Sequence, residues 1–285
     1  MESKAANEAS DLERLLVKSL AQTDTITKKE TIMDLKIKGK NALITGSTKG
    51  IGRAIAEALA AEGCNLGICS RNASEVTEAI SDLSAHGVKV VGSSVDISDG
   101  DALSAWVDSC AEKLGGIDIF VPNVSIGAGQ PGIEGWKTVF NVDILGTIVG
   151  INSARPHLEK SGSSSIIIIS STAALEAGFG ADPYCAMKAA LLNYSGTLSQ
   201  EVAPSGIRVN CVSPGPIFVE GGAWDNISKA MPEFFESTVA SIPLGRMGTA
   251  DEVATQVALL ASPLSGNTLG TNIVIDGGFT KGIQF

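Results

Sequence analysis

Histidine is almost absent from this sequence, whose 285 residues include only His86 and His157. Neither lies in a metal-ligand pattern, so we predict no metal site. Two histidines also leave little basis for a catalytic triad that uses histidine. The five cysteines are odd in number and show no Cys-x-x-Cys spacing. They are therefore expected to be small buried residues in a reducing compartment, which predicts a cytoplasmic location.

Charged residues are also scarce, at 18%, and 31 acidic residues outnumber 21 basic ones. No basic cluster occurs, so we expect no nucleic-acid partner. No apolar run reaches the length that spans a bilayer, so we expect no membrane partner either. Residues 1–32 lack the apolar segment of a secretory signal. They are predicted to be an extension that is either disordered or a short amphipathic helix.

Glycine is abundant, and after Met33 short apolar runs alternate with amphipathic segments. The predicted strands are Asn41–Thr45, Asn65–Ser70, Lys89–Val95, Ile117–Pro122, Ser165–Ser170, Ile207–Val212 and Asn272–Ile275. The predicted helices are Gly50–Glu62, Ala73–His86, Asp101–Leu114, Ile133 to near Lys160, Pro183 to near Pro204, Ser228–Ala240 and Asp251–Ala261. This alternation predicts an α/β fold: a single Rossmann-type, doubly wound parallel sheet of about seven strands with helices on both faces. It occupies one domain, residues 33–285.

A glycine-rich segment follows the first predicted strand: Thr45-Gly46-Ser47-Thr48-Lys49-Gly50-Ile51-Gly52. Gly46 permits a tight turn, Gly50 lets the backbone approach a pyrophosphate, and Gly52 lets the helix pack closely on the strand. The N-terminus of the next helix then points free N–H groups and a positive dipole end at the phosphates. The segment predicts a dinucleotide site that includes all residues from Gly46 to Gly52.

A tyrosine and a lysine lie four residues apart at the start of the fifth predicted helix. Asp182 is suited to cap this helix and Pro183 to begin it. Tyr184 and Lys188 then share one helix face. A phenol has an ordinary pKa of about 10, and a nearby ammonium lowers that pKa by favouring the phenolate. The pair can therefore exchange a proton with a carbonyl/alcohol couple.

These motifs, in this order, resemble the short-chain dehydrogenase/reductase family over roughly Leu35 to Phe279. The family pattern Thr-Gly-x-x-x-Gly-x-Gly is met at Thr45 to Gly52, and its Tyr-x-x-x-Lys is met at Tyr184 and Lys188. Further family positions are matched by Ser171, Asn141, Pro214-Gly215 followed by Ile217, and Ile275-Asp276-Gly277-Gly278.

Two segments depart from the family pattern. The family's Asn-Asn-Ala-Gly after the fourth strand is Pro122-Asn123-Val124-Ser125 here, which alters the loop near the nicotinamide. Asn123 is expected to keep its structural role. Val219 replaces a threonine that often follows the Pro-Gly pair, so we expect the cofactor contact there to come from the backbone of Ile217.

The resemblance implies a site that moves hydride between a nicotinamide and a carbonyl carbon. Tyr184 would give a proton to the nascent alkoxide, and Lys188 would lower the phenol pKa and hold the nicotinamide ribose. Ser171 would hydrogen-bond the carbonyl oxygen, and Asn141 would hold a water that links Lys188 to solvent. The alternative from another class is a non-catalytic sensor or scaffold that binds a dinucleotide with the same fold.

The end of the second predicted strand, Ser70-Arg71-Asn72, indicates the type of dinucleotide. Ser70 stands where an NAD enzyme usually carries an acid for the 2′-hydroxyl. Arg71 can pair with a 2′-phosphate, and Lys49 would add a second charge. We therefore predict that NADP(H) is preferred and that NAD(H) is possible. By family analogy Asp96 accepts a hydrogen bond from the adenine amino group, with Ile97 beside it.

The substrate pocket should lie beyond the carboxyl ends of the strands. The predicted walls are Ser125–Trp136, Thr172–Phe179 and Phe218–Phe235, within or near a substrate loop at residues 216–248. Their apolar side chains are Leu175, Phe179, Phe218, Trp224, Met231 and Phe234. An apolar ketone or secondary alcohol suits these walls, such as a 3-oxoacyl thioester, a cyclic or terpenoid ketone, or a steroid. Gly221-Gly222 suggests a lid.

The resemblance also implies a homotetramer formed through the fourth and fifth helices and the last strand. The apolar stretch Val142–Ile151 agrees with such an interface, although it could equally face the core of the subunit.

Overall fold

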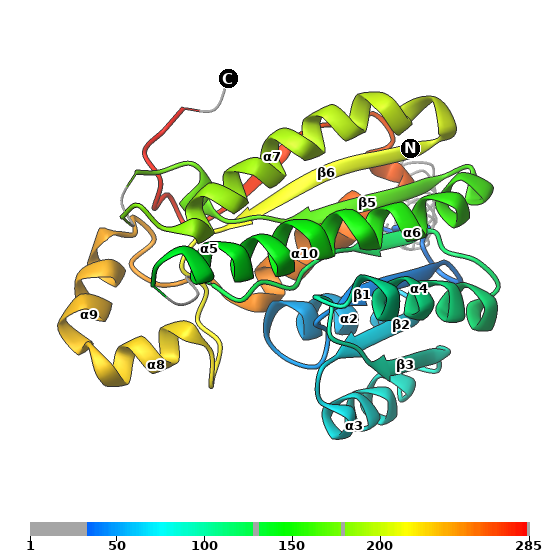
Figure 1. Ribbon diagram of the computed structural model, residues 1–285, viewed down its shortest axis with the longest axis horizontal. Coiled ribbons are helices and arrows are strands. Elements are labelled where there is room, and N and C mark those ends of the chain that lie inside the picture. Colours follow the sequence, from blue (N-terminus) through cyan, green and yellow to red (C-terminus); the bar gives the residue numbers. More distant parts are fainter. Residues whose placement is uncertain (1–32, 128–130, 178–179, 284–285) are drawn as a thin grey trace, which may run out of the picture. The chain divides into compact units, whose positions relative to one another are not determined.

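The computed structural model describes residues 33–127, 131–177 and 180–283 (Figure 1). The chain divides into two units, residues 1–34 and 35–285, and the predicted extension 1–32 lies outside the described residues. In the described part of the second unit, seven strands form one parallel sheet in the order β3-β2-β1-β4-β5-β6-β7. The predicted Rossmann-type, doubly wound α/β fold is therefore confirmed.

The strands keep close to their predicted bounds. They are β1 (Asn41–Thr45), β2 (Asn65–Ser70), β3 (Val90–Ser94), β4 (Ile119–Val121), β5 (Ser164–Ile169), β6 (Ile207–Pro214) and β7 (Asn272–Ile275). Every residue of β5 is buried, as expected of a central parallel strand covered on both faces. The edge strands β3 and β7 are only partly buried.

Helices cover both faces of the sheet. One face carries α2 (Gly50–Ala61), α3 (Ala73–Ser84) and α10 (Ala250–Ala261), whose apolar residues join one core cluster. The other face carries α4 (Gly100–Leu114), α6 (Gly146–Ser161) and α7 (Pro183–Val202), which join a second cluster. Within the described ranges, none of the helices has both the length and the apolar character to cross a lipid bilayer.

The helix predicted from Ile133 to near Lys160 is interrupted. It consists of α5 (Ile133–Val139), a π-helical turn (Phe140–Leu145) and α6. A π turn adds one residue to the turn and so rotates the following side chains by about 100° relative to a regular helix. Such turns occur frequently at functional sites.

The single helix predicted over Ser228–Ala240 is wrong, because this segment holds two helices. They are α8 (Ala223–Ala230) and α9 (Pro232–Ser241), separated at Met231. A residue before proline is kept out of the helical region, and Met231 has φ −140° and ψ 65°. Figure 1 shows α8 and α9 as a pair at the left of the view, beyond the ends of β5 and β6.

The strand order sets the position of a ligand site. From β1, the chain first adds β2 and β3 on one side of the sheet and then adds β4 to β7 on the other side. The connections after β1 and β4 therefore leave the sheet on opposite faces. In such sheets ligands bind in the crevice at the carboxyl ends of the strands, next to this switch point.

Candidate active site

The helix α7 presents the predicted tyrosine and lysine as expected. The Asp182 side chain accepts a hydrogen bond from the backbone N–H of Tyr184 at 2.6 Å, and Pro183 occupies the first turn. The Lys188 ammonium nitrogen lies 5.7 Å from the centroid of the Tyr184 ring. The capped helix start therefore fixes a phenol and an ammonium side by side.

Ser171 lies just after β5 and joins this pair. It caps a short 3₁₀ turn, Thr172–Ala174, by accepting from the backbone N–H of Ala173 at 3.1 Å. Its hydroxyl lies close enough to the Tyr184 phenol to favour a lower phenol pKa. The structure thus brings Ser171, Tyr184 and Lys188 together.

Lys188 is buried and held from two sides. Its ammonium donates to the Ile169 carbonyl oxygen at 3.0 Å. It also lies 3.5 Å from Asp143 Oδ2, in an ion pair whose side chains are 2% and 0% exposed. Asp143 belongs to the π turn, and its Oδ1 accepts from the backbone N–H of Ile126 at 3.3 Å.

Among the described residues no hydrogen bond or ion pair joins Asn141 directly to Lys188, and the predicted water-mediated role of Asn141 stays a prediction. Asn141 is partly exposed, and its amide donates to the Ser98 carbonyl oxygen at 3.5 Å. The helix turns about 200° over two residues, so Asn141 and Asp143 point to different sides. Asp143, which the sequence prediction missed, faces the lysine. An acid inside the apolar stretch Val142–Ile151 was the available signal.

Burial is the largest cause of the pKa shifts of Tyr184 and Lys188. Burial raises the pKa of Tyr184 above its ordinary value near 10, and the Asp143 charge raises it further, while the Ser171 hydroxyl opposes this shift. Burial lowers the pKa of Lys188, and Asp143 opposes that change. The net shift of the phenol pKa is therefore upward, with burial as its largest cause, and the predicted lowering by Lys188 stays a prediction.

The glycine-rich loop is shaped to accept a pyrophosphate. Gly50 has φ 62° and no atom lies within 4 Å of where its Cβ would be, so the backbone can approach a ligand there. A Cβ at Gly52 would collide with the Gly46 carbonyl oxygen and lie 2.6 Å from the Asn123 amide. In the described residues α2 has no side-chain cap at Lys49, which leaves its first N–H groups to an anion. These residues fit a dinucleotide.

Other residues of the loop have different roles. Ser47 is fully buried, with its hydroxyl donating to the Ile44 carbonyl and accepting from the Cys69 N–H. The Ser47 hydroxyl therefore joins β1 to β2, and the predicted cofactor contact of Ser47 stays a prediction for its backbone. Thr48 donates to Glu75 at 2.9 Å, and the exposed Lys49 ammonium lies 3.6 Å from the same carboxylate. The sequence prediction missed Glu75.

Beyond β2, Ser70 is half-buried, whereas Arg71 and Asn72 are exposed. Asn72 caps α3 by accepting from the N–H groups of Ser74 and Glu75. Asp96 is exposed after β3, and hydrogen bonds from Ser98, with a smaller effect of the Arg71 charge, lower its pKa.

On the other side of the switch point, Asn123 connects β4 to the glycine-rich loop. Its N–H donates to Thr45 Oγ1 at 3.0 Å, and its amide donates to the Thr45 carbonyl at 3.0 Å. Its expected structural role is therefore seen. Ile97 and Ile217 are buried, and Ile217 forms a backbone bridge with Gly248. Pro214 ends β6, and Gly215 donates to the Ile275 carbonyl.

The predicted substrate walls keep several apolar side chains at the surface. Leu175, Phe218, Met231 and Phe234 are between 37% and 51% exposed. The Trp224 ring stacks on Phe234 with centroids 6.1 Å apart. Phe179 and residues 128–130 lie outside the described residues. Gly221, in the predicted lid, donates to the buried Asp225 carboxylate at 2.8 Å.

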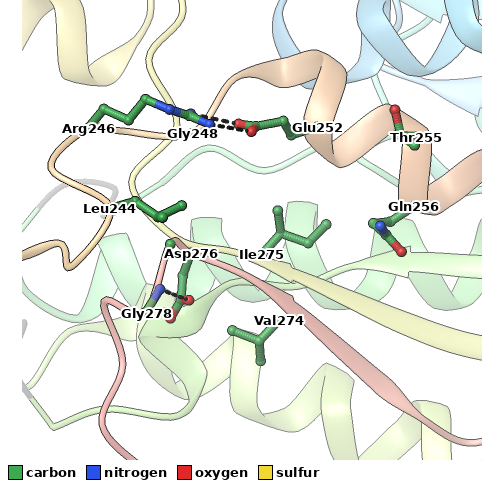
Figure 2. Close-up of a pocket in the computed structure, with 11 residues that line it drawn as sticks. Leu244, Arg246, Gly248, Glu252, Thr255, Gln256, Val274, Ile275, Asp276 and Gly278 are labelled. Carbon is green, nitrogen blue, oxygen red and sulfur yellow. Dashed lines mark hydrogen bonds and ion pairs between the residues drawn. The ribbon is translucent and has the colours of Figure 1, made fainter.

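A separate pocket of about 500 Å³ lies between β7, α10 and the segment before α10. Figure 2 shows Arg246 and Glu252 paired across its upper part and Asp276 accepting from Gly278 below them. None of its lining residues is among the predicted catalytic or cofactor-binding residues, although Leu244, Arg246 and Gly248 lie in the predicted substrate loop. The convergence of Ser171, Tyr184 and Lys188, rather than this pocket, therefore marks the candidate active site.

Comparison with known proteins agrees with this geometry. A family profile described as "Enoyl-(Acyl carrier protein) reductase" matches residues 46–280. Isoepoxydon dehydrogenase from Penicillium expansum is 38% identical over 89% of this chain and 100% of its own length. The crystal structure of L-sorbose reductase from Gluconobacter frateurii, complexed with NADPH and L-sorbose, matches with TM-score 0.82 and 29% identity. It covers 88% of this chain and 100% of that one.

The chain belongs to the short-chain dehydrogenase/reductase family. It is an oxidoreductase of the type that acts on alcohol and ketone groups, and its fold binds a nicotinamide dinucleotide. An NAD⁺-bound xylitol dehydrogenase shares the fold at 23% identity and TM-score 0.78, over 85% of this chain and 100% of that one. Its bound NAD⁺ contrasts with the NADPH of the sorbose reductase.

Proposed function

We propose that this protein is an NADP(H)-dependent oxidoreductase that interconverts a ketone and a secondary alcohol, with Tyr184 as proton donor and acceptor. The meeting of Ser171, Tyr184 and Lys188 at the carboxyl end of the sheet carries this proposal. A bound nicotinamide supplies or accepts the hydride. Ser171 orients the carbonyl oxygen, Tyr184 exchanges the proton with it, and Lys188 holds the nicotinamide ribose.

The proposed cofactor contacts follow the same edge of the sheet. The loop from Gly46 to Gly52 binds the pyrophosphate through its backbone. Ser70 and Arg71, with Asn72 beside them, surround the adenosine ribose. The remaining proposed contacts are Asp96, Ile97, Asn123, Pro214, Gly215 and Ile217.

The preference for NADP(H) depends mainly on Arg71. It is exposed at the end of β2, and no acid stands at Ser70 to select a 2′-hydroxyl. Lys49 is 3.6 Å from Glu75, so part of its charge is already neutralised. The NADPH complex of the sorbose reductase supports the same choice.

Replacing Arg71 by alanine is expected to lower kcat/KM for NADPH by about 10- to 100-fold, because a hydrogen bond to a charged group contributes about 1.5–3 kcal/mol. The value for NADH should not change. Lys160→Ala, which removes an exposed cation from the last turn of α6, is the matched control. A wild-type enzyme that clearly prefers NADH would contradict the assignment.

We propose that the substrate is an apolar ketone or alcohol, such as a 3-oxoacyl thioester, a cyclic or terpenoid ketone, or a steroid. The exposed aromatic and aliphatic side chains of Phe218, Met231 and Phe234 support this class. The test follows NADPH oxidation optically against a panel of ketones, with phosphorylated sugars as the comparison. Tight cofactor binding without turnover on any ketone would favour the sensor or scaffold instead.

We also propose a cytoplasmic homotetramer. All five cysteines are free thiols, which suits a reducing compartment. Phe140 and Leu145, the two ends of the π turn, are 43% and 39% exposed, and β7 offers a partly exposed sheet edge. Val142, Ile144 and Ile151 pack into the core, so only the outer residues of this stretch are free for subunit contact. Light scattering during size exclusion measures the assembly.

A further inference from the structure

Asp143 is a fully buried carboxylate beside the proposed proton donor. Burying a charged group is costly unless it is paired and hydrogen-bonded. Here Oδ1 accepts from the Ile126 N–H, whereas Oδ2 has no hydrogen-bond partner among the described residues and faces the Lys188 ammonium at 3.5 Å. The ion pair is therefore the interaction that keeps this carboxylate in place.

The same ammonium lies 5.7 Å from the centroid of the Tyr184 ring. Lys188 carries three donors, of which one is bonded to the Ile169 carbonyl. A unit negative charge 3.5 Å from the ammonium offsets much of the potential that the ammonium creates at the phenol oxygen. A lysine paired in this way stabilises a phenolate less than an unpaired lysine would.

We infer that Asp143 is a positioning residue that, through its ion pair with Lys188, offsets the lysine charge and keeps the Tyr184 phenol in its protonated, proton-donating form. The inference rests on the proposed function of Tyr184. It adds a determinant of pH dependence: at neutral pH the resting phenol holds the proton that ketone reduction uses.

Other titratable groups surround the phenol without changing this conclusion. Asp182 precedes α7, Cys185 lies beside Tyr184 on α7, and Cys211 lies on β6 near Lys188. Burial is the largest cause that raises the Tyr184 pKa, the Ser171 hydroxyl opposes it, and Asp143 is the strongest of the charges that raise it. Asp182 is half-exposed, so water screens its charge more than that of Asp143.

The protonation state of Tyr184 determines how the rates of reduction and oxidation depend on pH. In reduction, a bound reduced nicotinamide would supply the hydride for the new C–H bond, and the Tyr184 O–H would break as its proton passes to the carbonyl oxygen. The phenolate then takes a proton from solvent. In oxidation the phenolate must exist first, so the rate of alcohol oxidation should rise only at alkaline pH, whereas reduction stays level through neutral pH.

The phenol can be titrated directly because the chain has only two tyrosines. In a Tyr194→Phe background, the ultraviolet absorbance of phenolate reports Tyr184 alone, with no cofactor or substrate present. Adding Asp143→Asn is expected to lower the titration midpoint by about one pH unit or more, the usual effect of removing a neighbouring like charge. A midpoint that is unchanged or raised would overturn the inference.

Two further variants serve as controls. Asp182→Asn removes the other nearby carboxylate but keeps the cap, since asparagine caps as well as aspartate. It should move the midpoint much less than Asp143→Asn, and an equal change would count against a specific role for Asp143. Asp143→Glu keeps the negative charge, so the titration midpoint of Tyr184 should stay near that of the Tyr194→Phe protein.

A second comparison remains available if the Asp143→Asn protein does not fold. Lys188→Met leaves the carboxylate alone and should raise the midpoint. Lys188→Met combined with Asp143→Asn removes both charges and should return the midpoint toward the parent value. Equal midpoints in these two proteins would overturn the inference.

The pH dependence of alcohol oxidation provides a second measurement. With an alcohol that the enzyme oxidises, Asp143→Asn should move the rising limb of kcat/KM to lower pH. Oxidation at pH 7 should then increase by about tenfold for every pH unit by which the midpoint falls. If no variant oxidises any alcohol while the midpoint still falls, the proposed function fails and the inference about Asp143 stands.

Discussion

Replacement of Tyr184 by phenylalanine is expected to reduce kcat for ketone reduction by about 10²- to 10⁴-fold, the range over which a positioned general acid contributes. The ring remains to pack beside the Lys188 ammonium, which keeps its bond to the Ile169 carbonyl. Dinucleotide affinity should therefore not change. Steady-state rates with the best ketone, together with a titration of the cofactor by intrinsic fluorescence, measure both effects.

The other tyrosine of the chain is the matched control. Tyr194 lies ten residues further along α7, partly buried against the second core cluster, and takes no part in the proposed site. Tyr194→Phe removes the same hydroxyl from the same helix and should leave kcat unchanged. Near-normal turnover by the Tyr184→Phe enzyme would refute the assignment of the proton donor.

The features that the sequence predicts well depend on short-range rules. The bounds of β1, β2 and β7 match their predictions, because each strand is a short, largely apolar run bounded by glycine or polar residues. The cap at Asp182 and the shared face of Tyr184 and Lys188 follow from four-residue helical spacing.

The features that the sequence misses depend on longer-range geometry. Asp143 meets Lys188 because a π turn changes the phase of the helix, and a regular repeat counted along the sequence does not contain that change. The direction of the Tyr184 pKa shift depends on how deeply the folded chain buries the phenol, so a nearby lysine alone could not predict it.

Replacement of Lys188 by methionine is expected to destabilise the folded protein by about 3–5 kcal/mol, because it leaves the Asp143 carboxylate buried without its cation. Methionine nearly conserves the volume of the side chain, so the loss reports the charge and not a cavity. Urea unfolding of wild type and variant at one fixed protein concentration measures the difference, since assembly into the proposed homotetramer would make stability depend on concentration.

The double variant separates stability from chemistry. Lys188→Met with Asp143→Asn replaces the ion pair by two uncharged side chains, and it should recover much of the lost stability because no unpaired charge remains buried. Ketone reduction should not recover, because the double variant still lacks the ammonium that we propose holds the nicotinamide ribose. If Lys188→Met were as stable as wild type, Asp143 could not be a buried charge that depends on Lys188. If the double variant regained activity, Lys188 would contribute only to folding, and its place in the catalytic site would have to be abandoned.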